Sequence, residues 1–180
     1  AKFTAVTCDT NDVSVNDWTA PITTTQTLSY VPVGAATGAG NWGSVLVTPR
    51  VAVIENEQVE NDPTTIGVAL PVVLAGRIKT PGDQDRFLVT LKKGESLRCT
   101  PWTGALQSPA WLKIKILHPD GRMLAESPVN EASEWRFDFS PPEDAVYQVV
   151  VEELLGRGGN NFVYALQLDV SGYVTAALKG

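Results

Sequence analysis

The sequence has little histidine, cysteine and charge. It contains one histidine and two cysteines, and charged residues make up 19%, below the roughly 25% of ordinary soluble domains. A single histidine excludes metal sites that need several histidine ligands. The 14 basic and 20 acidic residues give a net charge of −6. This balance argues against nucleic acid as a partner, because phosphates attract clustered lysine and arginine.

Long apolar runs and catalytic motifs are missing as well. No run approaches the ~20 apolar residues of a membrane helix, so no membrane insertion is expected. No nucleophile elbow, phosphate-binding loop or zinc-protease motif occurs, and the sequence therefore predicts a non-catalytic protein. The chain opens without an initiator methionine or a signal-peptide core. A mature exported chain begins in this way, as does an excised piece of a longer protein.

Two alternatives remain open for the cysteines. Cys8 and Cys99 are 91 positions apart, which excludes the close spacing of redox and zinc motifs. They are either two buried side chains that act as small hydrophobic groups, or one disulfide that ties the N-terminal stretch to the rest of the chain.

The composition divides the chain into three parts. Residues 1–53 are rich in threonine and glycine, and no charge occurs from Trp18 to Pro49. Apolar runs at 28–33 and 45–47 predict strands here, so this part is a strand-rich extension or the end of a preceding β-domain. Residues 54–172 are expected to form a β-sandwich, and residues 173–180 a C-terminal tail.

Alternation of apolar and polar residues predicts the strands of the sandwich. Leu112, Ile114 and Ile116 alternate with two lysines, which is the period of a strand with one buried face. Similar patterns begin at residues 87, 135, 147 and 162, and turn residues separate them. The sequence therefore predicts an all-β fold, an antiparallel and jelly-roll-like β-sandwich.

The turns and strand ends lead to three further predictions. The glycine-rich turns at 93–94 and 156–159 are expected to close hairpins. Glu152 and Glu153 end a strand and are expected to form a solvated edge that discourages edge pairing. His118 precedes a Pro-Asp-Gly turn, where a solvated side chain is expected.

Seven short elements occur in an order that resembles a known family. They are Glu57-Gln58-Val59-Glu60-Asn61-Asp62, Gly76-Arg77-Ile78, Gly82-Asp83-Gln84-Asp85-Arg86-Phe87, Lys93-Gly94-Glu95-Ser96-Leu97, Pro119-Asp120-Gly121-Arg122-Met123-Leu124-Ala125, Phe139-Ser140-Pro141-Pro142-Glu143-Asp144 with Tyr147-Gln148-Val149, and Gly158-Gly159 with Tyr164-Ala165-Leu166. Residues from about 55 to 170 thus resemble the bacterial pre-peptidase C-terminal domain, a β-sandwich found beside secreted peptidases and in other exported proteins.

The resemblance implies a calcium site. Its candidate ligands on this chain are Glu57, Asn61, Asp62, Asp83 and Asp85, because calcium takes carboxylate and amide oxygens. Two acidic clusters would also repel each other without a cation between them. Val59 and Glu60 replace a glutamate and a proline of the family pattern, and Glu126-Ser127-Pro128 stands where the family often has an Asn-Asp-Asp cluster. The alternative is that Asp62 and Asp83 cap turns.

Five tryptophans raise the alternative of a carbohydrate ligand. Trp42 and Trp102 lie beside glycines and are expected to be exposed, where an indole ring can stack on a sugar. Core packing is the competing interpretation, because tryptophan is buried on average. Trp135 alternates with two phenylalanines and is expected in the core.

Two hypotheses follow for the function. The first is an exported accessory or binding module, in the medium, the periplasm or at the cell surface. It would assist the secretion or stability of a longer protein or attach it to a matrix or polysaccharide, with neighbouring domains or copies of itself as partners. The second is a structural subunit of an extracellular filament or surface layer, in which residues before Ile54 complete a neighbour's sheet by β-strand addition.

Overall fold

The computed structural model of the chain describes residues 13–15, 27–35, 41–55, 66–129 and 135–172. The chain divides into two compact units. One consists of residues 1–49 with 105–107, and the other of residues 50–104 and 108–180. None of the helical segments in the described ranges has the length and hydropathy of a membrane span.

The first unit contains a three-stranded antiparallel sheet. Strands β1 (Val13–Val15), β2 (Thr27–Ala35) and β3 (Asn41–Val47) lie in the order β1-β2-β3. Strands β2 and β3 pair from Thr27↔Val47 to Val33↔Asn41. The strands predicted at 28–33 and 45–47 are therefore confirmed, and their described parts pair with each other.

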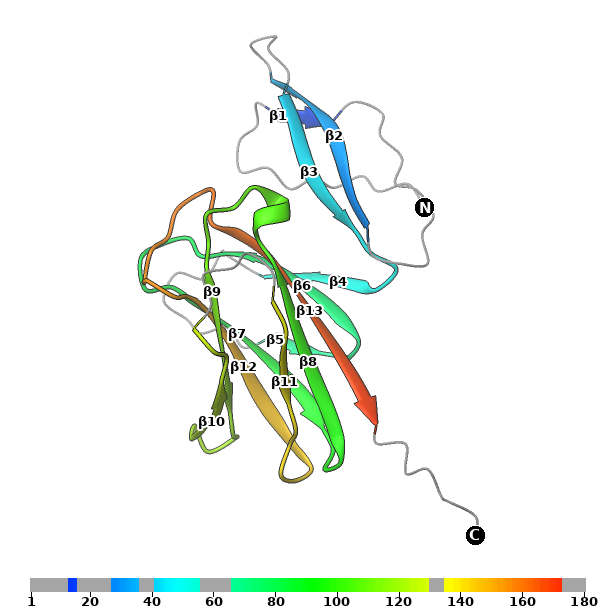
Figure 1. Cartoon of the computed structure of the whole chain (residues 1–180), viewed down its shortest axis with the longest axis vertical. Helices are drawn as coiled ribbons and strands as arrows, with labels where there is room; N and C mark the ends of the chain where they lie inside the picture. The colour runs from blue at the N-terminus through cyan, green and yellow to red at the C-terminus, as the bar shows by residue number, and fades with distance from the viewer. Residues whose placement is uncertain (1–12, 16–26, 36–40, 56–65, 130–134, 173–180) are drawn as a thin grey trace. The chain divides into compact units, whose positions relative to one another are not determined.

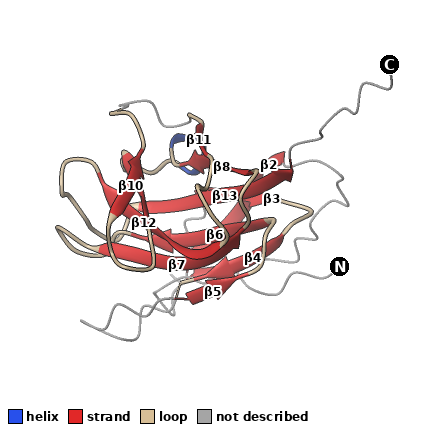
Figure 2. Cartoon of the chain, turned by 90° about the horizontal axis from the view of Figure 1, so that it is seen from below, coloured by secondary structure: helices blue, strands red, loops and turns tan. Residues whose placement is uncertain are grey.

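The second unit is a sandwich of two five-stranded sheets, which can be followed in Figure 1. The β12 sheet has the order β10 (Met123–Glu126), β9 (Leu112–Leu117), β12 (Ala145–Glu153), β7 (Gln84–Leu91) and β5 (Ile66–Val68). The β13 sheet has the order β11 (Phe137–Phe139), β8 (Glu95–Trp102), β13 (Val163–Gly172), β6 (Val72–Arg77) and β4 (Val51–Ile54). The all-β sandwich is thus confirmed. Figure 2 draws strands in red and helical residues in blue, and the short helical turn η1 (Gly104–Leu106) follows β8 in the chain.

The inner faces of the two sheets form one core. Its fully buried large side chains are Tyr147, Tyr164, Phe87, Leu74, Ile78, Leu91, Leu97, Ile114, Ile116, Leu166 and Leu168. Those in β9 and β13 occupy alternate positions, as the period of two predicted. Trp135 is partly buried against this core, in agreement with the alternation in its segment.

The connections between strands differ from the expectation. The turn at 93–94 joins β7 to β8, and the turn at 156–159 joins β12 to β13, so each leads from one sheet to the other. Only the turn between β9 and β10 closes a hairpin within the sandwich as described, with His118 N donating to Arg122 O at 2.8 Å. The predicted hairpins were wrong because turn residues reverse the backbone without selecting the sheet that receives the next strand.

Two edge pairs also depart from an antiparallel arrangement. Strand β4 pairs with β6 in parallel from Val51↔Val72 to Ile54↔Ala75. Strand β5 pairs with β7 in parallel from Ile66↔Phe87 to Val68↔Val89. The other strand pairs of the sandwich are antiparallel. Parallel neighbours need a crossover, and here the chain makes it by visiting the opposite sheet in between.

Candidate functional site

Acidic side chains from both sheets meet at one end of the sandwich. Asp85 lies on β7 two residues before Phe87, and it faces inward like that core residue. The hydroxyl of Tyr164, on β13 of the other sheet, donates to Asp85 Oδ2 at 2.6 Å and lies 3.3 Å from Glu55 Oε2. The Tyr164 hydroxyl therefore links two carboxylates and the two layers.

The environment of Tyr164 keeps its hydroxyl protonated. The side chain is 2% exposed, and burial, followed by the charges of Asp85 and Glu55, raises the pKa of Tyr164 well above 10. A phenolate here would be buried beside two carboxylates, which desolvation and repulsion both disfavour. Tyr164 is thus a fixed hydrogen-bond donor to the acidic cluster.

A glycine makes room for this cluster. Gly76 pairs with Tyr164 across β6 and β13. A Cβ atom at position 76 would lie 2.5 Å from the Tyr164 hydroxyl oxygen and closer still to Glu55 Oε2. Any larger residue would therefore push the tyrosine or the glutamate away. Glu55 is held from the other side, because its Oε1 accepts a hydrogen bond from Arg77 N at 3.0 Å.

Asp83 and Asp85, two of the three aspartates predicted as calcium ligands, make different contacts. Asp83 caps its own turn, with Oδ2 accepting from Lys79 N at 2.8 Å and Oδ1 from Gln84 N at 3.0 Å. The turn-capping alternative therefore describes Asp83, whereas Asp85 belongs to the cluster with Glu55. The other three candidates, Glu57, Asn61 and Asp62, lie outside the described residues. Within the described ranges, no group of three or more histidine, cysteine, aspartate or glutamate side chains is arranged to hold a metal.

The sequence did not identify Glu55, Gly76 and Tyr164 as members of one cluster. The signal was present, because three of the seven resembling elements contribute to it: Gly76 from the second, Asp85 from the third and Tyr164 from the last. Their separation along the chain concealed their proximity. Only the register of β6, β7 and β13 brings them to the same end.

The two tryptophans expected to be exposed have different positions. Trp102 ends strand β8, is partly buried, and its indole Nε1 is inaccessible to solvent with no hydrogen-bond partner among the described residues. Trp42 lies on β3 opposite Pro32, and its side chain is outside the described part. A sugar-stacking platform at these positions stays a prediction.

Cys99 lies in the core of the sandwich. It is 0% exposed, and burial, with a smaller contribution from Asp138, raises the pKa of its thiol far above the ordinary value. Such a thiol is unreactive, because the thiolate is the nucleophilic form. Cys8 lies outside the described residues, so its pairing with Cys99 stays a prediction.

Glu152 does not form the solvated edge that the sequence indicated. It lies on the outer face of β12, the central strand of its sheet, and is 7% exposed. Its Oε1 contacts Lys113 Nζ at 2.5 Å and Lys115 Nζ at 2.7 Å, and its Oε2 accepts from Gln84 Nε2 at 2.7 Å. Burial alone would raise the pKa of Glu152, but the two lysines lower it.

Glu153 is buried on the opposite side of β12. Its side chain is 0% exposed and accepts five hydrogen bonds, from Trp111 N, Leu155 N, Arg157 N and the Nε and Nη2 of Arg157. The Arg157 guanidinium also lies over the rings of Trp111 and Phe162, 4.9 and 5.5 Å from their centroids. Burial opposes ionisation, yet these donors lower the pKa of Glu153. The carboxylate thus anchors the β12–β13 connection.

The imidazole ring of His118 contacts two carboxylates. Its Nδ1 lies 3.0 Å from Asp120 Oδ2, and its Nε2 lies 3.0 Å from Glu143 Oε1. The imidazole side chain is 18% exposed and packs edge-on against Tyr147. Contrary to the expected solvated side chain, His118 ties the β9–β10 turn to the β11–β12 connection.

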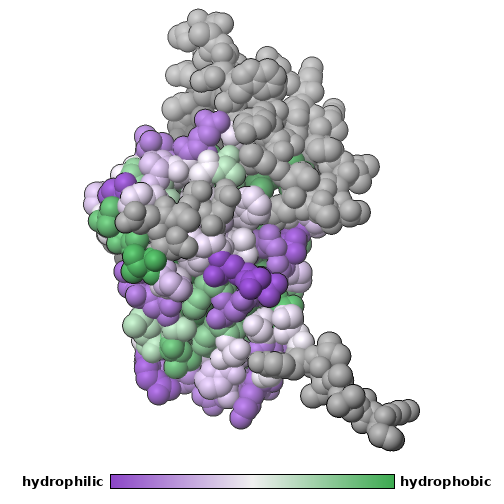
Figure 3. Space-filling model, viewed as in Figure 1, coloured by the Kyte–Doolittle hydropathy of each residue, from purple (hydrophilic) through white to green (hydrophobic). Residues whose placement is uncertain are grey.

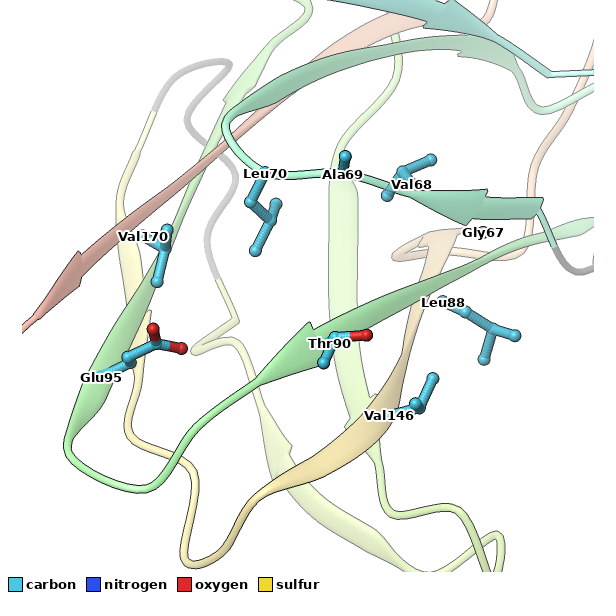
Figure 4. A pocket seen from close by; sticks show the side chains of 9 residues that line it. All are labelled: Gly67, Val68, Ala69, Leu70, Leu88, Thr90, Glu95, Val146 and Val170. Atoms are coloured by element: carbon cyan, nitrogen blue, oxygen red, sulfur yellow. The ribbon is translucent and has the colours of Figure 1, made fainter.

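An open groove of about 560 Å³ lies at the side of the sandwich. Figure 4 shows its lining, which comes from both sheets: Gly67, Val68, Ala69, Leu70, Leu88, Thr90, Glu95, Val146 and Val170. The only ionisable side chain among them is that of Glu95, whose Oε2 accepts from Lys92 N at 2.8 Å. The described residues that line the groove are therefore mainly aliphatic, and none of them is aromatic.

The rest of the visible surface is mixed. Figure 3 shows hydrophilic side chains over much of the sandwich, with small hydrophobic areas between them. The exposed large apolar side chains are Val51, Ile54, Met123, Val129, Val146 and Leu155. Val51 and Ile54 both belong to β4, and the other four come from separate parts of the chain, as single exposed apolar residues do on many proteins. Val146 alone among them lines the groove.

Comparisons with known proteins give only distant likenesses. No family model and no curated protein matches the sequence. Among solved structures, the chain is similar to a periplasmic inhibitor of g-type lysozyme from Aeromonas hydrophila, with 13% identity and a TM-score of 0.47 over 67% of this chain and 100% of that chain. It is also similar to the pre-peptidase C-terminal domain of a collagenase from Bacillus anthracis, with 10% identity and a TM-score of 0.45 over 63% of this chain and 100% of that chain. The second neighbour is a domain of the kind that the sequence motifs resemble.

Proposed function

We propose that the chain is a non-catalytic, exported binding module that joins the protein it belongs to with a protein partner. The observation that carries this proposal is the open groove, which both sheets line with aliphatic side chains around one carboxylate. Apolar concave surfaces with a few polar groups are typical binding sites. Its described lining includes no aromatic platform, so it fits an apolar polypeptide segment better than a sugar.

The contacts of four ionisable residues of the sandwich support binding over catalysis. Asp83 and Glu153 accept backbone N–H groups of their own turns, and Glu152 is held by two lysines. His118 lies between two carboxylates at a hairpin. These contacts give each side chain a structural role. Export rests on the resemblance and on the weakly charged, threonine-rich composition.

The test of this proposal is selection of binding peptides. A displayed library of short random peptides is selected on the immobilised chain, on Val146→Lys and on Val129→Lys. Val146 is 43% exposed in the groove, and Val129 is 75% exposed outside it. We expect peptides with alternating apolar residues that bind the unchanged chain and Val129→Lys but not Val146→Lys.

Two results would contradict the proposal. One is equal binding of the selected peptides to both lysine variants, which would place their site elsewhere. The other is retention of the chain on insoluble polysaccharides that is lost when Trp42 and Trp102 are changed to alanine. That outcome would favour the carbohydrate hypothesis.

A calcium ion would stabilise such a module at its acidic end. Asp85 and Glu55 supply carboxylate oxygens from different sheets within reach of Tyr164, and hard oxygen ligands suit calcium. Glu57, Asn61 and Asp62 follow Glu55 closely in the sequence and would complete the ligands, whereas Asp83 is occupied by its turn. The role is structural: the ion would offset the charge that accumulates between the sheets.

Thermal unfolding with and without chelator tests the calcium proposal. If only the folded chain binds, added calcium stabilises it by RT ln(1 + [L]/Kd), and EDTA removes this gain. We expect Asp85→Asn to abolish the calcium-dependent rise in Tm, and Asp120→Asn, in the distant β9–β10 turn, to retain it. An identical Tm with calcium and with EDTA would rule the ion out.

A further inference from the structure

Arg86 lies next to the groove on the outer face of the β12 sheet. It precedes Leu88, which lines the groove, by two positions on β7. Phe87 between them belongs to the core, so Arg86 and Leu88 project from the same outer face. On the neighbouring strand β12, Val146 lines the groove and Gln148 follows two positions later. Polar side chains therefore continue the face of which the aliphatic lining is one part.

The guanidinium of Arg86 contacts two amides. Its Nη1 donates to Gln148 Oε1 at 2.9 Å, and its Nη2 donates to Gln84 Oε1 at 2.6 Å. Within the described part of the chain, no carboxylate forms an ion pair with Arg86. Amide oxygens hold the planar group in place without neutralising it, and its five N–H donors exceed these two contacts. Arg86 is thus an oriented cation with donors to spare.

The other cations of this face are balanced by carboxylates. Lys113 and Lys115 both contact Glu152 Oε1, at 2.5 and 2.7 Å. Glu126, on β10, pairs in register with Lys115 and so shares its face. Two carboxylates therefore accompany two ammonium groups. Among the described residues of the outer face, the uncompensated positive charge is that of Arg86, beside the groove.

Charge changes sign from one end of the groove to the other. Figure 4 shows Thr90 between Leu88 and Glu95, the carboxylate of the lining. Arg86 lies beyond Leu88 on β7, at the end away from Glu95. An acidic side chain of a bound segment would be repelled at the Glu95 end and attracted at the Arg86 end. The two charges therefore select both the composition and the direction of the segment.

We infer that the groove selects a partner segment in which an acidic side chain accompanies apolar ones, and that Arg86 is the residue that recognises this acid. The apolar side chains of the segment contact Leu88 and Val146, and its carboxylate accepts hydrogen bonds from Arg86. Two residues of an extended chain span about 7 Å, which is also the spacing of positions 86 and 88 along β7. The inference rests on the proposed function, because it names the chemistry of the polypeptide that fills the groove.

Peptide selection on the immobilised chain tests the inference. The displayed library is fused to its carrier through the C-terminal end of each peptide, so that only side chains supply carboxylates. We expect the selected peptides to carry aspartate or glutamate two positions from an apolar residue. Changing that acid to its amide should weaken binding to the unchanged chain by about ten-fold, the effect of one hydrogen bond between charged groups. Titration of labelled peptides measures this ratio.

Variants of Arg86 assign the preference to its side chain. Arg86→Gln should bind the acidic peptide and its amide form equally, whereas Arg86→Lys should keep a weaker preference for the acid. Arg86→Glu should instead select peptides with lysine or arginine at that position. Arg122→Gln is the matched control, because Arg122 is exposed in the β9–β10 turn and its change removes the same charge. It should leave the ten-fold ratio unchanged.

The outcomes separate this inference from the proposed function. Val146→Asn makes the lining polar without changing its charge. If the selected peptides lose affinity for Val146→Asn but show no preference for an acid, the inference is wrong and the groove remains a binding site. An acid preference that persists in Arg86→Gln would also overturn the inference, because another residue would then recognise the acid. Equal binding of all selected peptides to Val146→Asn and to the unchanged chain would remove the proposed function and the inference together.

Discussion

Glu152 and Glu153 are neighbours in β12, but the regions around them bury a carboxylate in different ways. On the outer face of the sheet, Glu152 is covered by the flexible side chains of Lys113, Lys115 and Gln84. In the β12–β13 connection, Glu153 accepts hydrogen bonds from fixed backbone N–H groups and from Arg157. A buried charge needs donors, and donors that are already fixed lose less entropy when they bind. The connection should therefore depend on its carboxylate more than the outer face does.

The largest effect is expected from Glu153→Gln. The amide cannot satisfy five donors, and the charge opposite Arg157 is lost, so the free energy of unfolding should fall by about 3 kcal/mol. Urea denaturation measures the change. Glu143→Gln, at a side chain that is 62% exposed, should cost less than about 1 kcal/mol. Equal losses in both variants would show that the connection does not depend on Glu153.

Arg157→Lys should have the next largest effect. Lysine retains the charge but lacks the planar group that lies over Trp111 and Phe162 and donates to Pro109 O. We expect a loss of about 1–2 kcal/mol, again from urea denaturation. Arg98→Lys is the matched control, because Arg98 also forms an ion pair with a carboxylate, that of Asp138. The side chain of Arg98 is 48% exposed. If Arg157→Lys lowered the free energy of unfolding no more than Arg98→Lys, the contacts of Arg157 with the two rings would contribute no stability.

Acid should destabilise the protein through both glutamates. Their pKa values are lowered from 4.5 in the folded state, so the unfolded chain binds more protons as the pH falls below 4.5. The stabilisation is complete above that value and is lost as the pH falls through the lower pKa of the folded state. Urea denaturation between neutral and acidic pH should show this decline. Glu153→Gln should reduce this pH dependence of stability more than Glu152→Gln. The reverse order would contradict the stronger dependence on Glu153.

The smallest effect is expected from Glu152→Gln, about 1 kcal/mol at low salt. The side chains of Lys113 and Lys115 are 23% and 24% exposed. Water can therefore replace part of the hydrogen bonding that the Glu152 carboxylate supplies to the two ammonium groups. Raising the salt from about 0.05 M to about 1 M should reduce this loss, because ions screen charges near the surface. The loss in Glu153→Gln should change less over the same range. A salt response of equal size at both positions would show equal solvent access.

The strands could be predicted from the sequence because their signal is local. Ile114 and Ile116 alternate with lysines, and both are fully buried. The turn at Asp83 was also recognisable from its residues, and its carboxylate caps the turn through two backbone N–H groups. Which sheet receives each strand was not predictable in this way. That choice depends on packing between residues far apart in the chain, and nearly all connections of the sandwich lead to the opposite sheet.

In the candidate sites, too, the local sequence indicated single elements, and packing between distant residues decided how they meet. Motif order placed Gly76, Asp85 and Tyr164 in separate elements, and their meeting required the registers of three strands in two sheets. Glu152 and Glu153 were expected in water, because two adjacent charges at a strand end carry no local sign of burial. Their burial depends on lysines from β9 and on Arg157 beyond the end of β12.

By itself, the sequence determined an all-β chain with a uniform period of two, polar turns and an acidic balance, since each of these properties resides in neighbouring residues. The tertiary structure alone decided the switching of strands between the sheets, the linkage of two carboxylates by Tyr164 and the open groove beside residues 169–172. These features depend on side chains from both sheets that are far apart in the sequence and pack against each other only in the folded protein.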